Sequence, residues 1–212
     1  MCIRDSYLFV LLFSASFVAL QSCSKDDPVP EDDQEEVGGV TLTFTEVERE
    51  AHGDHYHYND ITGAETETVS FSGNPLLPPV GAHLHLEEGK TYRLSMVAKD
   101  FAGREIQQTF IDRDDIHQVF LLGAPAGALE YVYADRKADN TKVNVGVTGY
   151  LTVLKAADSF TFRYVLRHLN PGVKAGITAA DWNNVNFTKF SGENDLDLKV
   201  ELHLVHDGDH GH

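Results

Sequence analysis

The chain of 212 residues contains only two cysteines, two methionines and 17 basic residues, and each scarcity excludes a class of protein or site. Cys2 falls in the leader described below, so Cys23 is the only cysteine of the mature chain and no internal disulfide can form. Met96 is the only methionine after the leader, which argues against a soft Cu(I) site. The 33 acidic residues give a net charge of −16, which argues against nucleic-acid binding because Lys and Arg make phosphate contacts.

The chain has one long apolar run, at its N-terminus, and lacks a second. Residues 7–20 are largely apolar and lead into Leu20-Gln21-Ser22-Cys23, the pattern cleaved by a bacterial lipoprotein signal peptidase. We therefore expect a signal peptide over residues 1–22 and a lipidated Cys23 as the membrane anchor. Residues 1–6 lack the net positive charge of a signal peptide and resemble a translated sequencing adapter, so we interpret them as an artefact.

Residues 23–38 are acidic, contain proline and are poor in apolar side chains, a composition that predicts a disordered tether. The tetrapeptide Ser24-Lys25-Asp26-Asp27 resembles the surface-export signal of Bacteroidota lipoproteins. We expect lipid anchoring in the outer membrane with exposure at the cell surface, and the periplasmic face is the alternative.

Residues 39–205 alternate between apolar and polar side chains in several short segments, as β-strands do. Residues 195–204 show the pattern most clearly, with every even position apolar and every odd position polar. The same alternation marks residues 40–45, 92–96, 149–154 and 160–166, and no segment shows a comparable helical stripe. The sequence predicts an all-β domain, a single antiparallel immunoglobulin-like β-sandwich.

Nine of the eleven histidines are clustered, and imidazole with nearby carboxylate is a ligand set that suits zinc, copper or nickel. We expect the first cluster, at residues 51–57, to lie in a Gly- and Asp-rich loop that can wrap a cation, with Asp54 or Asp60 supplying an oxygen ligand. The second cluster, His83 and His85, lies on one face of a strand, and His203 lies on the polar face of the last strand. The tail at residues 206–212 is predicted to scavenge metal. The candidate ligands are His52, Asp54, His55, His57, His83, His85, His203, His206, His210 and His212.

Each cluster also has a purely structural interpretation. His83 and His85 could simply form a polar strand face over Leu84 and Leu86, and the tail could be a solvated end without function. The two unclustered histidines, His117 and His168, lie at strand ends within apolar runs, which favours hydrogen-bonded structural residues. Zinc is the favoured metal, with copper or nickel as alternatives, and affinity should fall below about pH 6 as imidazoles protonate.

Several short segments occur in an order that resembles a family of uncharacterised Bacteroidota outer-membrane lipoproteins, some of them labelled type 1 periplasmic-binding-fold proteins. The resemblance implies a β-sandwich lipoprotein often encoded near TonB-dependent receptors, with such a receptor as a partner. Where relatives have an Asp-rich loop this chain has residues 136–140 (RKADN), which argues against calcium there. The segments are residues 86–92 (LEEGKTY), 115–120 (DIHQVF), 133–135 (YAD), 149–153 (GYLTV), 166–168 (LRH) and 192–196 (GENDL).

The common catalytic motifs, such as the nucleophile elbow and the His-Glu-x-x-His helix, are absent from the sequence, so an enzyme is not expected. The sequence predicts a surface lipoprotein that binds a divalent transition metal, accessory to outer-membrane metal uptake. The alternative is a glycan- or protein-binding lipoprotein without a metal, in which Trp182 and its amide neighbours would contact the ligand.

Overall fold

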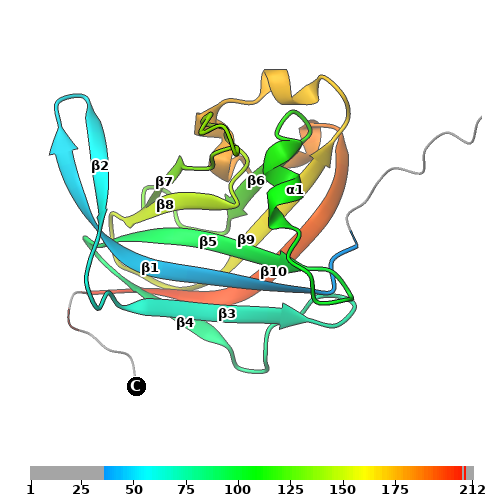
Figure 1. The fold of residues 1–212 in the computed structure, drawn as a ribbon. Helices are drawn as coiled ribbons and strands as arrows, with labels where there is room; N and C mark the ends of the chain where they lie inside the picture. The colour runs from blue at the N-terminus through cyan, green and yellow to red at the C-terminus, as the bar shows by residue number, and fades with distance from the viewer. Residues whose placement is uncertain (1–35, 207, 209–212) are drawn as a thin grey trace, which may run out of the picture. The chain divides into compact units, whose positions relative to one another are not determined.

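The computed structural model describes residues 36–206 and residue 208, and these residues form two β-sheets (Figure 1). The six-stranded sheet contains β1 (Gly39–His52), β2 (His55–Asp60), β3 (Thr66–Ser72), β5 (Thr91–Lys99), β7 (Leu129–Tyr133) and β8 (Thr148–Val153). The four-stranded sheet contains β4 (His83–Glu87), β6 (His117–Leu122), β9 (Ala157–Leu169) and β10 (Gly192–Val205). The predicted signal peptide, Cys23 and nearly all of the predicted tether lie outside the described residues.

The long strand β1 organises the six-stranded sheet. It pairs with β5 along one edge, and along its other edge it pairs first with β3 and then with β2. Since pairing with β5 stops at Val47, the rest of β1 and β2 project from the sheet as a two-stranded hairpin, which Figure 1 shows rising from the body.

The four-stranded sheet has the order β4-β10-β9-β6. The even residues of β10 from Leu196 to Leu204 are all buried, so the predicted alternation is confirmed. The prediction of wholly antiparallel pairing is wrong at one place, because β4 runs parallel to β10. The chain leaves β3 in one sheet and enters the other through residues 73–82, and this crossover brings β4 in beside β10 in the parallel direction.

The main hydrophobic core lies between the two sheets and takes side chains from both. Alternate residues such as Leu42 and Phe44 of β1 and Phe162 and Tyr164 of β9 are completely buried there, as period-two strands with one inward face require. The prediction of an all-β fold with two sheets is therefore confirmed. The more specific immunoglobulin-like arrangement stays a prediction.

A smaller apolar cluster covers the outer face of the four-stranded sheet, where Phe120 and Val165 pack against Phe187 and Phe190. The segment that supplies these phenylalanines contains three short 3₁₀ helices, η1 (Val173–Gly176), η2 (Ala179–Asn183) and η3 (Phe187–Lys189). The single α-helix of the described residues, α1 (Gln107–Asp112), has six residues. No helix in this part of the chain is long and apolar enough to cross a membrane.

A close approach between β7 and β8 requires glycine at position 149. A Cβ atom placed there would lie 2.2 Å from Cζ of the buried Tyr131 ring. We expect Gly149→Ala to lower the free energy of unfolding by about 1–3 kcal/mol, because the ring cannot move without disturbing the core. Denaturant unfolding would measure the change, and Gly176→Ala, where an added Cβ meets nothing within 4 Å, is the matched control. Equal stability of the two variants would contradict this account.

Candidate metal centre

Two histidines that the sequence placed 51 residues apart are cross-strand neighbours in the four-stranded sheet. His117 is the first residue of β6 and pairs directly with His168 of β9. Both strands alternate, and Val119 and Leu121 of β6 and Tyr164 and Leu166 of β9 belong to the core between the sheets. The two imidazoles therefore lie on that same inner face, with ring centroids 5.0 Å apart and planes at 75°.

Asp195 joins these histidines through a β-bulge in β10. The pairing register of β10 with β9 shifts between Asn194 and Leu196, which leaves Asp195 unpaired. A bulge re-aims the side chain of the extra residue. The Asp195 side chain is consequently 0% exposed, whereas the Asp197 side chain on the regular part of the strand is 32% exposed.

The three side chains His117, His168 and Asp195, here called the buried trio, converge on one point. Oδ2 of Asp195 lies 3.4 Å from Nε2 of His117 and 3.8 Å from Nδ1 of His168. The His117 side chain has no exposed surface and the His168 side chain is 17% exposed. Among residues 36–206 and 208, this is the one group of three His, Cys, Asp or Glu residues whose ligand atoms all lie within 4.8 Å of one another.

The hydrogen bonding of His117 determines which of its ring nitrogens directs a lone pair toward the Asp195 carboxylate. Nδ1 donates to the backbone carbonyl of Arg113 at 3.0 Å, so in the neutral imidazole Nε2 carries no hydrogen. Nε2 of His117, Nδ1 of His168 and both carboxylate oxygens of Asp195 are buried and have no hydrogen-bond partner among the described residues. A lone pair facing a buried carboxylate is unfavourable unless a cation lies between them.

The spacing of the buried trio fits a tetrahedral ion. Two ligand atoms bonded to one zinc at about 2.0–2.1 Å lie roughly 3.3–3.4 Å apart. The distance between His117 and Asp195 already matches this value, and the distance between His168 and Asp195 is a few tenths of an ångström longer. The contact from Nδ1 of His117 to a carbonyl is also the kind that orients metal-binding histidines. The buried trio could therefore hold a metal ion.

The surroundings of the buried trio hold its ligands in place. The Phe110 ring of α1 packs edge-on against His117, with centroids 5.2 Å apart. The Lys174 ammonium donates hydrogen bonds to the carbonyls of His117 and Asn144, and burial lowers the pKa of Lys174 to about 8.

A cavity of about 320 Å³ next to the buried trio is lined by Asp195, Leu196 and residues of the loops at 36–37 and 73–76.

The first sequence cluster lies on the projecting hairpin, so the prediction of a loop is wrong there. β1 continues to His52 and pairs with β2 through a two-residue turn in which Gly53 has a φ of 62°. Alternation of apolar side chains stops before this segment, which is why sequence reasoning assigned no strand. Nε2 of His55 and Nε2 of His57 lie 3.1 Å apart, and the His52 ring centroid is 4.5 Å from that of His57.

The two aspartates expected as oxygen ligands for the first cluster, Asp54 and Asp60, lie in different surroundings. Oδ1 of Asp54 lies 3.2 Å from Nδ1 of His55 at the exposed tip. Asp60, expected as a further donor, forms an ion pair with Arg93 of β5 instead.

The second cluster and His203 meet on the outer face of the four-stranded sheet. The parallel register of β4 and β10 places His203 beside His85 and Glu201 beside His83. The ring centroids are 4.8 Å apart for His85 and His203, 5.0 Å for His83 and His85, and 5.7 Å for His83 and His203. Desolvation, followed by the charges of His203 and His83, lowers the pKa of His85.

The remaining candidates are dispersed. Nδ1 of His206 lies 2.8 Å from a carboxylate oxygen of Glu88, and His210 and His212 lie outside the described residues. The Trp182 ring packs against Tyr131, with centroids 6.0 Å apart, and is partly buried against the core. The segment 133–135 ends in Asp135, whose buried carboxylate accepts three backbone hydrogen bonds from residues 145–148.

Sequence reasoning set His117 and His168 aside as structural residues and did not consider Asp195 as a ligand. The signal that could have found them is the polar residue within each apolar strand end, since a buried His or Asp needs a partner. Comparison of the chain with protein-family models, with curated proteins and with solved structures found no match.

Proposed function

We propose that the protein binds a divalent transition metal, with zinc favoured, through His117, His168 and Asp195. The observation that carries the proposal is the buried Asp195 carboxylate facing the lone-pair nitrogen of His117 without a hydrogen-bond partner for either atom. An ion between them would compensate the buried charge and satisfy all three side chains. Imidazole with carboxylate suits zinc, and copper and nickel are the alternatives.

We favour binding over catalysis because the ligands are enclosed. The side chains of His117 and Asp195 have no exposed surface and that of His168 is 17% exposed, so an ion held among them would be largely shielded from a substrate. Burial also predicts slow release of the metal, since the ligands must separate before the ion can leave. Slow release suits a protein that stores or delivers metal.

The setting of this function is part of the proposal and rests on the sequence. The Leu-Gln-Ser-Cys motif and acidic tether support a lipid-anchored protein of the outer membrane, exposed at the cell surface. A net charge of −16 would draw cations toward the protein. A TonB-dependent receptor that imports the metal is the partner that the family resemblance suggests.

Zinc should raise the thermal stability of the chain, because an ion that binds only the folded state stabilises it by mass action. At free zinc about 1,000 times the dissociation constant the gain is about 4 kcal/mol. For a domain of this size, about 2–4 °C per kcal/mol gives a rise in Tm of about 8–16 °C, measured by calorimetry. EDTA should reverse it, and calcium, which prefers oxygen ligands, should produce no comparable rise. A Tm that zinc leaves unchanged would contradict the proposal.

A further inference from the structure

The edge strands of the two sheets lie beside each other along an open seam. Among the described strands β4 pairs only with β10, and β3 pairs only with β1, apart from an isolated bridge between Ser72 and Leu77. β3 and β4 are nonetheless in contact, and Figure 1 shows them side by side. Unpaired edges usually need covering or charge to prevent adhesion to other strands. This seam carries imidazoles on one side and carboxylates on the other.

Three histidines, here called the seam trio, occupy the β4 side of this edge: His83, His85 and His203. Imidazoles that share one tetrahedral ion at bond lengths of about 2.0–2.1 Å have ring centres roughly 5 Å apart. The three measured separations of 4.8, 5.0 and 5.7 Å lie close to that value. Their ligand atoms do not yet converge as those of the buried trio do, so the partly exposed rings would rotate to meet an ion.

Two rings of the seam trio each have an oxygen atom close to one of their nitrogens. Nδ1 of His83 lies 2.9 Å from the carbonyl of Gly81, which leaves Nε2 as the free ligand atom. Nε2 of His203 lies 3.0 Å from a carboxylate oxygen of Glu201, which leaves Nδ1 free. An acceptor behind each imidazole is the usual arrangement at metal sites.

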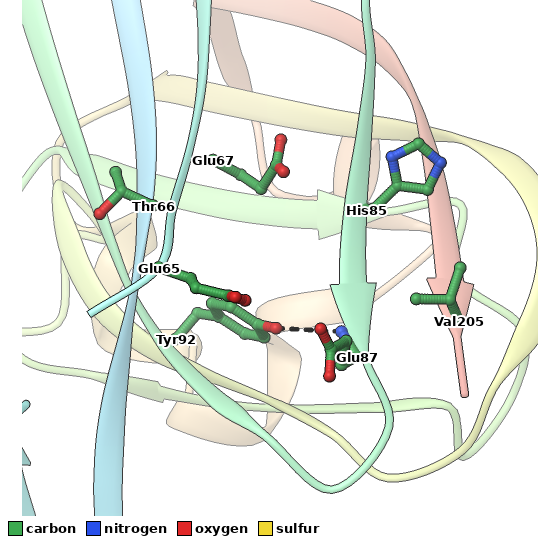
Figure 2. A pocket seen from close by; sticks show the side chains of 7 residues that line it. All are labelled: Glu65, Thr66, Glu67, His85, Glu87, Tyr92 and Val205. Carbon is green, nitrogen blue, oxygen red and sulfur yellow. Dashed lines mark hydrogen bonds between the residues drawn. The ribbon is translucent and has the colours of Figure 1, made fainter. Parts of the chain in front are cut away.

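A carboxylate of the other sheet lies near the seam trio. Glu67 of β3 and His85 of β4 both line a cavity of about 280 Å³, and Figure 2 shows the ribbon of β4 between the two side chains. Burial raises the pKa of Glu67, and the nearby His83 opposes that rise. At the lower end of the cavity the carboxylates of Glu65 and Glu87 are paired with Lys90. Glu67 is therefore the carboxylate at this seam that remains for a cation.

We propose that His83, His85, His203 and Glu67 form a second divalent transition-metal site that joins the two sheets across the seam. The site is separate from the buried trio, since Asp195 and His203 lie roughly 25 Å apart along β10 at the rise of an extended strand. Its partly exposed ligands should exchange metal faster than the buried trio and bind it more weakly. The two sites then differ in kind, one accessible and one enclosed.

The test uses zinc alone and the full chain carrying Asp195→Asn, so that its outcome does not depend on the buried trio. Calorimetric titration would compare this chain with the same chain bearing His83→Ala, His85→Ala and His203→Ala. We expect the seam variant to lose one zinc equivalent. His52→Ala, His55→Ala and His57→Ala in the hairpin form the matched control, which should keep that equivalent. A seam variant with unchanged zinc stoichiometry would overturn the proposal.

Three further measurements keep the proposal testable if the triple variant folds poorly. In the unaltered chain, zinc added beyond the first equivalent should shift the imidazole NMR signals of the seam trio, and signals that never shift would overturn the site. Glu67→Gln should weaken zinc binding at the seam by about 10-fold. Full affinity in that variant would overturn the bridging of the two sheets. Zinc should also slow amide hydrogen exchange in β3. The hairpin control variant should show the same slowing.

Discussion

Replacing Asp195 by Asn should weaken zinc binding at the buried trio by about 100-fold or more, since even groups behind the ligands contribute 10- to 100-fold to metal affinity. The same change should leave the metal-free protein as stable as before or more stable. An Asn amide can donate a hydrogen bond to the lone pair on Nε2 of His117, which the carboxylate cannot do. Zinc titration with a competing chelator and denaturant unfolding with EDTA would measure the two effects.

The stability of metal-free Asp195→Asn separates a metal centre from a purely structural ion pair. If His117 were a protonated partner of Asp195, removing the carboxylate would leave a buried charge and cost about 3–5 kcal/mol. Asp197→Asn is the matched control on the same strand, because that carboxylate is partly exposed and pairs with Arg163 instead. It should leave zinc affinity unchanged. A large loss of stability in Asp195→Asn would argue for the ion pair.

Replacing Asp135 by Ala should produce the largest loss of stability. Its buried carboxylate accepts hydrogen bonds from the backbone amides of Val145 at 3.1 Å, Gly146 at 2.6 Å and Thr148 at 2.6 Å. Desolvation raises the pKa of Asp135, and these three amides oppose the rise. Three buried donors without partners would cost at least about 3 kcal/mol at 1–3 kcal/mol each. Denaturant unfolding would measure the change.

The loop that Asp135 holds also supports the buried trio. Val119 of β6 donates to the carbonyl of Val145, and Lys174 joins the carbonyls of Asn144 and His117. We therefore expect Asp135→Ala to weaken zinc binding as well. Asp139→Ala is the control, because that exposed carboxylate holds the backbone amide of Thr141 and no buried amide. Equal stability of the two variants would show that the three amides find other partners.

Alternation along the strands made much of the fold predictable. In β10 it predicted both the buried even residues and the outward position of His203, because one face of the strand is covered and the other is not. The inward turn of Asp195 depends on a bulge that adds one residue to the strand, and the alternation itself carries no sign of it. The pairing of His117 with His168 depends on which strands are neighbours, which no local pattern specifies.

The clustered histidines also show how little sequence proximity says about which residues meet in the fold. Proximity in sequence drew attention to His52, His55 and His57, and the hairpin does bring them together. Proximity in sequence did not indicate that Glu67 lies near these histidines. The seam forms only because β3 and β4 are edge strands of different sheets. The most enclosed candidate centre came from three isolated polar residues in apolar surroundings. Burial without a partner was the more specific indicator of a ligand.

The most direct test is an anomalous difference map from crystals of the full chain grown with one equivalent of zinc. We predict a peak at about 2.0–2.2 Å from Nε2 of His117, Nδ1 of His168 and an Asp195 carboxylate oxygen. Such a peak would place the first ion between the three atoms that lack hydrogen-bond partners. Zinc found at the hairpin or the seam, with nothing between His117 and Asp195, would contradict the central claim.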